Sequence, residues 1–228
     1  MRSPIYFDNA ATTPIRNEVI EVMTDILKNN YGNASSSHSF GRSSKSLIEK
    51  YRKDVAAYFK VSPSEIIFTS GGTEADNLVL RSAVRDLGIK TVITSKIEHH
   101  AILHTLDQLV KEYPISVFYV DLDENGEVYY NHLEKLLKTN NKALVSLMHV
   151  NNEIGNLLDI DHVANLCKTH DALFHSDTVQ SVGHYPIDLS AIPIDFLAAS
   201  AHKFHGPKGV GFCFIRKNSG LQPLIFGG

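Results

Sequence analysis

Apolar residues along the chain follow two alternating patterns. Repeats at three- and four-residue spacing predict amphipathic helices, and short, nearly continuous apolar runs predict buried strands. The predicted helices are Pro14–Lys28, Phe40–Phe59, Thr73–Leu87, Ala101–Lys111, Leu133–Leu137 and Ile160–His170. The predicted strands are Ile66–Thr69, Thr91–Thr94, Ile115–Val120, Leu144–Val150, Leu173–His175, Phe196–Ala199 and Val210–Ile215. In the first helix, Pro14 suits the first turn because its missing N–H needs no partner there.

The order of these elements predicts the fold class. From Ser64 onward, strands and helices alternate, which favours a mostly parallel sheet with helices on both faces. The sequence shows no repeat and no convincing linker, so we expect residues 1–13 to be an N-terminal arm and 14–228 to be one α/β domain. Ligands of such sheets bind beyond the carboxyl ends of the strands. Reactive residue types should therefore gather there.

Composition narrows the function classes. The chain has 228 residues, 43% of them hydrophobic, and a net charge of −3, so a nucleic-acid partner is not expected. No apolar run is long enough to span a membrane, and Met1–Thr13 lacks the layout of a signal peptide, so we expect a cytoplasmic protein. Cys167 and Cys213 have no zinc-ligand spacing and are expected to be small buried hydrophobic residues. No metal site is predicted.

Lys203 lies between two apolar strands, Phe196–Ala199 and Val210–Ile215. Burial disfavours the charged ammonium, so the pKa of Lys203 should fall. A neutral amine is a nucleophile suited to Schiff-base chemistry with an aldehyde cofactor. The alternative interpretation is a surface lysine in a turn.

The turn after the first strand is rich in glycine. Gly71, Gly72 and Thr73 open a predicted helix, where free backbone N–H groups and the helix dipole favour a phosphate. The alternative is an ordinary capping box formed by Thr73 and Asp76. The turn is neither a Walker sequence nor a full dinucleotide fingerprint, which disfavours a nicotinamide-dinucleotide binder.

Two further strand ends carry polar residues. His99 follows the second strand, where an imidazole can stack on a flat ring or move a proton. The alternative is that His99 only stands at the start of a helix and has no role in a site. Asn152 stands in the turn after Leu144–Val150. Its amide can bind a carboxylate or a ring oxygen, although asparagine is also a routine turn residue.

The strand ending at His175 is followed by Asp177 and Gln180. An aspartate at the end of a buried strand needs a cationic partner or several donors, and a protonated ring nitrogen is such a partner. Gln180 can bond a ring oxygen, whereas the alternative for Asp177 is a helix N-cap. Together with Ser200, His202 and Lys203, these residues meet the demands of pyridoxal phosphate.

The sequence resembles the cysteine desulfurases among the fold-type I, aminotransferase class-V pyridoxal phosphate enzymes, in the subgroup that serves iron–sulfur assembly and nitrogen fixation. The resemblance implies the large domain of a fold-type I transferase, with a mixed, mostly parallel seven-stranded sheet between helices. It rests on Tyr6–Pro14, Thr69–Asn77, Glu98–His99, Met148–Gly155, His175–Gln180 and Ser200–Gly211.

The resemblance also implies roles for single residues. Lys203 would form the internal aldimine, Asp177 would pair with the pyridinium nitrogen, and Gln180 would bond the phenolic oxygen. His99 would stack on the ring and assist proton transfer. The residues expected to hold the phosphate or line the substrate side are Gly72, Thr73, Ser200, His202 and Asn152.

The implied activity converts L-cysteine to L-alanine and passes persulfide sulfur to an acceptor or iron–sulfur scaffold protein, in a homodimer. The family's persulfide cysteine and substrate-binding arginine lie beyond Gly228, in a smaller C-terminal domain. We therefore expect a truncated form that holds the cofactor and is inactive alone. Alternatives are a selenocysteine lyase or another class-V aminotransferase and, from a different class, a non-catalytic scaffold.

Overall fold

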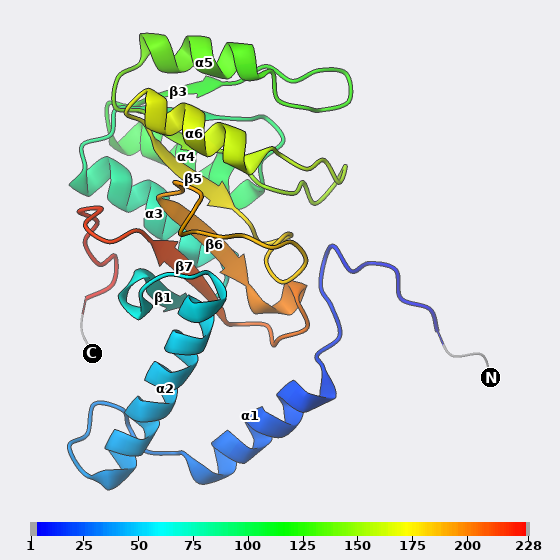
Figure 1. Cartoon of the computed structure of the whole chain (residues 1–228), viewed down its shortest axis with the longest axis vertical. Coiled ribbons are helices and arrows are strands. Elements are labelled where there is room, and N and C mark those ends of the chain that lie inside the picture. Colours follow the sequence, from blue (N-terminus) through cyan, green and yellow to red (C-terminus); the bar gives the residue numbers. More distant parts are fainter. Residues whose placement is uncertain (1–3, 227–228) are drawn as a thin grey trace.

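The computed structural model describes residues 4–226, so the ends of the predicted arm and domain, 1–3 and 227–228, lie outside the described residues (Figure 1). The helices are α1 (Asn17–Asn29), α2 (Ser39–Tyr58), α3 (Gly72–Asp86), α4 (His100–Glu112), α5 (Tyr130–Thr139) and α6 (Ile160–Thr169). The strands are β1 (Ile66–Thr69), β2 (Thr91–Thr94), β3 (Ser116–Tyr119), β4 (Leu144–Ser146), β5 (Leu173–Asp177), β6 (Phe196–Ser200) and β7 (Gly211–Ile215). Short 3₁₀ turns cover Pro63–Glu65 and Ala201–Lys203.

The strands form one seven-stranded sheet in the order β1-β7-β6-β5-β4-β2-β3. Strands β2 to β6 pair in parallel, whereas β7 runs antiparallel to both β1 and β6. The carboxyl ends of β4, β5 and β6 therefore lie next to one another at one edge of the sheet. This mixed, mostly parallel sheet confirms the predicted fold class.

Two hydrophobic clusters hold the helices against opposite faces of the sheet. One cluster joins Leu133 of α5 and Val163 of α6 to the strands, and the other joins Val79 of α3 and Leu106 of α4. All four side chains are almost fully buried, and burial of such a side chain contributes about 1.5–3 kcal/mol. Adjacent strand residues point to opposite faces, so both layers depend on the same strands.

The first helix begins later than its sequence pattern predicts. Pro14 lies outside α1, which starts at Asn17. The preceding residues are held extended instead, because Thr13 N–H donates to His202 O at 2.8 Å and Arg16 N–H donates to His205 O at 3.2 Å. Among residues 4–226, nothing covers the apolar stripe of α1 completely: no residue of this helix is buried, and Leu27 is 76% exposed.

Two strand ends differ from the prediction by two residues or more. The apolar run Leu144–Val150 forms a strand only as far as Ser146, because its neighbour β2 ends at Thr94. Strand β5 is longer than predicted, because Ser176 and Asp177 pair with β6. Asp177 is therefore the last residue of a strand and not part of a loop.

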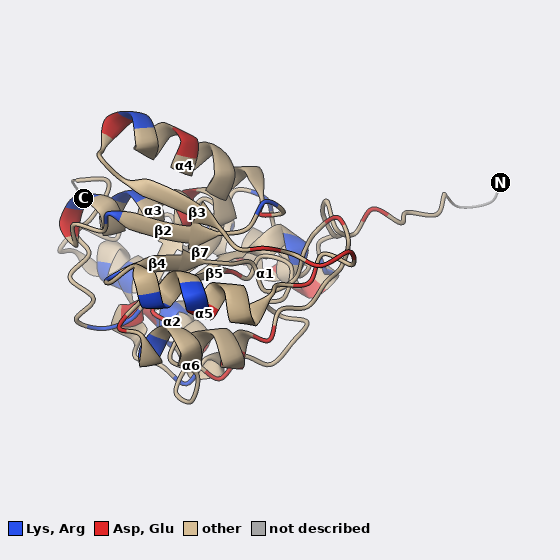
Figure 2. Ribbon diagram, turned by 90° about the horizontal axis from the view of Figure 1, so that it is seen from above, with Lys and Arg blue, Asp and Glu red and all other residues tan. Residues whose placement is uncertain are grey.

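Charged residues of both signs share the outer surface. Helix α4 contains Asp107, Lys111 and Glu112, and both charge colours are visible on this helix in Figure 2. Among residues 4–226, no helix combines the length and the apolar character that a membrane crossing requires. The described surface thus carries mixed charge.

Candidate active site

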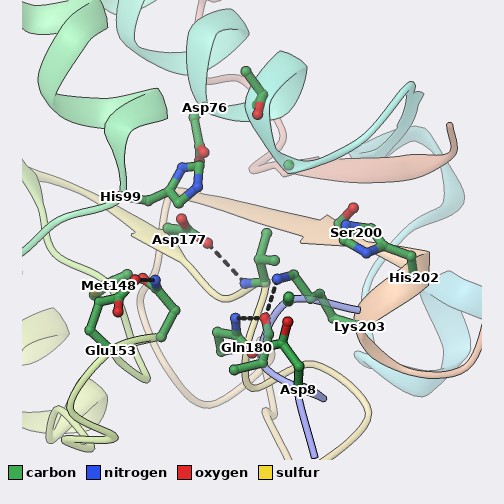
Figure 3. A pocket seen from close by; sticks show the side chains of 16 residues that line it. Asp8, Asp76, His99, Met148, Glu153, Asp177, Gln180, Ser200, His202 and Lys203 are labelled. Carbon is green, nitrogen blue, oxygen red and sulfur yellow. Dashed lines mark hydrogen bonds between the residues drawn. The ribbon is translucent and has the colours of Figure 1, made fainter. Parts of the chain in front are cut away.

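One cavity of about 460 Å³ lies at the carboxyl ends of the central strands (Figure 3). It brings together every residue selected from the sequence, from five separate segments of the chain. These residues are Gly72, Thr73, His99, Asn152, Asp177, Gln180, Ser200, His202 and Lys203. The predicted residues therefore share one site, and their individual roles stay predictions.

The backbone of the glycine turn after β1 packs closely against the side chain of Val179. Gly71 has a φ of +156°, and a Cβ on Gly72 would lie 2.4 Å from Val179 Cγ2. Gly71 is the N-cap of α3 and offers no side-chain cap, so the capping box of Thr73 and Asp76 is wrong. The first N–H groups of α3 thus face the cavity end as potential anion donors.

Ser200 and His202 extend this donor cluster from the other side. Ser200 is the last residue of β6 and is 4% exposed. Its Oγ lies 3.4 Å from the point where a Cβ on Gly71 would be. His202 Nδ1 lies 3.1 Å from Thr12 Oγ1. Burial, together with two neighbouring lysines, lowers the pKa of His202. Helix N–H groups, a hydroxyl and an imidazole at one end of a cavity fit a phosphate group.

Lys203 is half-buried in the cavity wall, within the short 3₁₀ turn that follows β6. Burial lowers the pKa of Lys203, and the acidic residues Asp177 and Asp8 partly oppose this shift. The predicted direction is therefore confirmed. The ammonium donates a hydrogen bond to the carbonyl oxygen of Ala10. The amine consequently sits where it can meet a ligand that enters the cavity.

Asp177 lies on the cavity floor and is 5% exposed. Its Oδ1 accepts a hydrogen bond from Val179 N–H at 2.9 Å. Burial raises the pKa of Asp177 to about 7, and the nearby Asp76 adds to the shift. No helix follows Asp177 before β6, so the N-cap alternative is wrong. A carboxyl group so poorly solvated is suited to a cationic partner.

Three amide and imidazole groups complete the predicted set. His99 is the N-cap of α4, and its Nδ1 accepts a hydrogen bond from Ala101 N–H at 3.1 Å. It therefore stands at a helix start and also lines the cavity. Gln180 Nε2 donates to Ala10 O at 2.8 Å. Asn152 Nδ2 donates to Glu153 Oε1 at 2.7 Å. The amides are thus already oriented by short contacts.

Sequence reasoning missed part of the cavity wall. The additional lining residues are Asp8, Ala10, Ala11, Asp76, Met148, Glu153 and Val179. The arm residues belong to the quoted Tyr6–Pro14 stretch, but nothing local indicates that they reach a loop about 190 positions away. Thr13 Oγ1 bridges that loop: it donates to His202 O at 2.9 Å and accepts from His205 N–H at 2.8 Å.

The donor set matches the chemistry of pyridoxal phosphate. The anion-binding end is built from the α3 N-terminus and Ser200, and the close approach of Val179 to Gly72 leaves no room there for a side chain. Lys203 supplies an amine of lowered pKa, and Asp177 supplies a buried carboxyl group that forms no ion pair with the residues that the structure describes. These groups complement a phosphate, an aldehyde and a protonated ring nitrogen, respectively.

Comparisons with known proteins agree with this geometry. The family model for class-V aminotransferases matches residues 5–228. A protein called cysteine desulfurase IscS, from Dictyoglomus turgidum, is 44% identical over 100% of this chain, and the chain spans 58% of its length. Two solved structures are similar across 98% of this chain: a NifS-like protein (TM-score 0.93, 41% identity, 62% of that chain) and "SspA in complex with cysteine" (TM-score 0.91, 35% identity, 65% of that chain).

Proposed function

This chain belongs to the aminotransferase class-V family, and we propose that it forms the cofactor-binding part of a pyridoxal-phosphate-dependent cysteine desulfurase. In this proposal residues 14–228 are the cofactor-binding domain and 1–13 are an arm. The observation that carries the proposal is the single cavity shared by the nucleophilic Lys203, the buried Asp177 and the α3 N-terminus. The name of the Dictyoglomus relative and the cysteine bound to SspA support L-cysteine as the substrate.

In this proposal, groups at two ends of the cavity would hold the cofactor. Backbone N–H groups of Gly72 and Thr73, the Ser200 hydroxyl and the His202 imidazole would hold the phosphate. Asp177 would accept a hydrogen bond from the ring nitrogen, and a cation there would lower the raised pKa of this carboxyl group. When bound, pyridoxal phosphate supplies an aldehyde for an amine and a ring that accepts electrons.

Lys203 would act twice, first as the nucleophile and then as the base. Its lowered pKa increases the fraction of neutral amine at a given pH, which both roles require. After the substrate amine replaces it, Lys203 Nζ would take the proton from the substrate Cα. His99 would cover the ring and assist this proton transfer, Gln180 would bond the ring oxygen, and Asn152 would orient the substrate.

Transfer of sulfur needs a thiolate that this chain's two cysteines do not provide. Cys167 and Cys213 are buried to within 1% of full burial, and burial raises the pKa of both thiols. A buried, protonated thiol is a poor nucleophile. The 228-residue chain should therefore bind cofactor and L-cysteine without passing sulfur to a sulfur-acceptor or iron–sulfur scaffold protein. A homodimer, as in the family, belongs to the same proposal.

A spectroscopic titration tests the proposed function. Pyridoxal phosphate added to the 228-residue chain should give the visible absorbance of a lysine-bound cofactor. L-cysteine should then change this absorbance, whereas L-serine should leave it largely unaltered, and no sulfide should be released. A cofactor spectrum that L-cysteine does not alter would refute cysteine as the substrate. Sulfide release would refute the assignment of sulfur transfer to a thiol other than Cys167 and Cys213.

A further inference from the structure

A chain of three buried polar side chains runs beneath the cavity from the sheet to α3. Ser146 Oγ of β4 lies 2.9 Å from His175 Nδ1 of β5, and His175 Nε2 lies 3.4 Å from Asp76 Oδ1 of α3. All three residues are at most 1% exposed. Asp76 also lines the cavity, and Asp177, two residues after His175, shares its face of the strand. Figure 3 shows Asp76, His99 and Asp177 projecting toward the same part of the cavity.

The contact between Asp76 and His175 is incomplete without a proton. Among residues 4–226, four buried side-chain atoms lack a hydrogen-bond partner, and two of them are Asp76 Oδ1 and His175 Nε2, which face each other. Buried polar atoms are rarely left unpaired. Either an Nε2–H on His175 or a proton on Asp76 can link the two atoms, and only the proton on Asp76 leaves both residues uncharged. The second imidazole nitrogen then carries its own hydrogen and donates to Ser146 Oγ.

The surroundings disfavour a negative charge on Asp76. Burial raises the pKa of Asp76 well above its ordinary value and lowers the pKa of His175 to about 4. The other titratable groups that influence this region are mostly acidic. Glu98, next to α4, has a pKa raised to about 8, and Asp76 raises the pKa of both Asp177 and the Cys213 thiol of β7. An ionised Asp76 would therefore oppose the ionisation of Asp177.

We propose that Asp76, His175 and Ser146 form a proton-holding relay that keeps Asp76 uncharged, so that Asp177 is the anion presented to the cofactor's ring nitrogen. This inference rests on the proposed function for its cofactor, but the protonation of the relay is a property of the chain itself. Asp76 and His175 are positioning residues in this account. They act on the ionisation of Asp177, and neither one has to touch the reacting atoms.

The relay can be tested without cofactor. In the 228-residue chain near neutral pH, nitrogen NMR of His175 should show a neutral imidazole with its hydrogen on Nδ1. Infrared spectroscopy should show the carbonyl stretch of a protonated carboxyl group that disappears in Asp76→Asn. The difference spectrum separates Asp76 from Glu98, whose pKa is also raised. A doubly protonated His175, or no carboxyl band assigned to Asp76, would overturn the proposal.

Variants test its consequence for the cofactor. Asp76→Asn imitates the protonated carboxyl group, so its affinity for pyridoxal phosphate and the pH profile of binding should match those of the unaltered chain. His175→Gln can present an amide N–H to Asp76, and a hydrogen bond donated to the carboxyl group favours its ionised form. Binding near neutral pH should weaken by about tenfold, equivalent to one pKa unit on Asp177. The acid limb of the profile should move to higher pH.

The double variant provides the decisive control. Adding Asp76→Asn to His175→Gln removes the unwanted charge and should restore both the affinity and the pH profile. A purely structural role for His175 predicts no rescue, and that result would overturn the relay, as would tighter binding by Asp76→Asn alone. If the unaltered chain binds no pyridoxal phosphate, the proposed function fails, and the NMR and infrared measurements still decide the protonation of Asp76.

Discussion

The two sides of the cavity are built by different means. The floor, with Asp177, His175 and Asp76, consists of strand and helix residues that are at most 5% exposed. The outer wall is the described part of the arm, residues 4–13, which contains no helix or strand and in which Phe7 is 88% exposed. Polar contacts such as Thr13 N–H to His202 O, at 2.8 Å, hold this arm in place.

This difference separates two roles: the floor sets the pKa values of acidic groups in the site, and the arm closes the cavity. On the floor, desolvation raises the pKa of both acidic groups, Asp76 and Asp177, so burial controls the ionisation of these two side chains. The arm contributes a carbonyl, Ala10 O, to which both Lys203 and Gln180 donate. Changes on the floor should therefore alter ionisation and cofactor affinity, whereas changes in the arm should alter how well the site is closed.

The largest effect is expected at Lys203, where floor and arm meet. Lys203→Ala removes the amine, so the visible absorbance of lysine-bound pyridoxal phosphate should be lost completely, although weak noncovalent binding can remain. Lys208→Ala is the matched control, because Lys208 is exposed and lies outside the cavity. An unchanged absorbance in Lys203→Ala would show that the cofactor uses another lysine.

Asp177→Asn should have the next largest effect on the floor. Loss of a charged hydrogen bond to the ring nitrogen costs about 1.5–3 kcal/mol, which corresponds to roughly 10- to 100-fold weaker binding. Equilibrium titration of the apo chain with pyridoxal phosphate measures this change. Equal affinity in Asp177→Asn and the unaltered chain would remove Asp177 from the proposed site.

The same floor residue gives a pH dependence to the ligand-free chain. The pKa of Asp177 is raised from 3.8 to about 7, so its contribution favours the folded state at low pH and is lost as the pH rises through this window. Urea unfolding between about pH 4 and about pH 8.5 should show the loss. Asp177→Asn should remove the pH dependence of the unfolding free energy that lies below about pH 7. Glu98→Gln should remove a contribution to this pH dependence that extends to about pH 8. A profile that both variants leave unchanged would contradict these shifts.

A smaller effect is expected from the arm. Thr13→Val removes two hydrogen bonds, those to His202 O and from His205 N–H, and should reduce the free energy of unfolding by about 1–2 kcal/mol. Cofactor affinity should fall by a few-fold, with an unchanged pH profile. Phe7→Ala, at an exposed arm position, is the control and should change stability by less than about 0.5 kcal/mol. Indistinguishable results for the two variants would refute a closing role for the arm.

The smallest effect is expected from the two cysteines. Neither thiol should react with iodoacetamide in the folded chain, and Cys213→Ser and Cys167→Ser should retain cofactor affinity within about twofold. Mass spectrometry of the labelled protein, with a urea-unfolded sample as the positive control, measures the reaction. Rapid labelling of a folded sample would restore that cysteine as a candidate sulfur carrier.

Local patterns predicted the sheet and one of the three floor residues, Asp177. Buried strands have a clear apolar signature, and the reactive residues follow those strands directly, so Asp177 and Lys203 were recognisable. Asp76 was not, because its position three residues after Thr73 also fits a capping box. Its partner His175 is almost one hundred residues away, and only the α3–β5 packing brings them together.

The arm and the strand ends were less predictable for a related reason. Pro14 carries a helix-start signal, yet tertiary hydrogen bonds from the segment around His202 keep the preceding residues extended. The run Leu144–Val150 is apolar throughout, but the strand ends where β2 ends. In both regions the backbone conformation depends on a segment that is distant in the sequence. The local sequence pattern contains no information about that segment.

The most direct test of the central claim is to locate the cofactor's covalent attachment. The 228-residue chain is incubated with pyridoxal phosphate, reduced with borohydride, digested and mapped by mass spectrometry. We predict that the modified lysine is Lys203 and that prior addition of L-cysteine lowers its labelling. Labelling spread over exposed lysines such as Lys208, with Lys203 unmodified, would contradict the account.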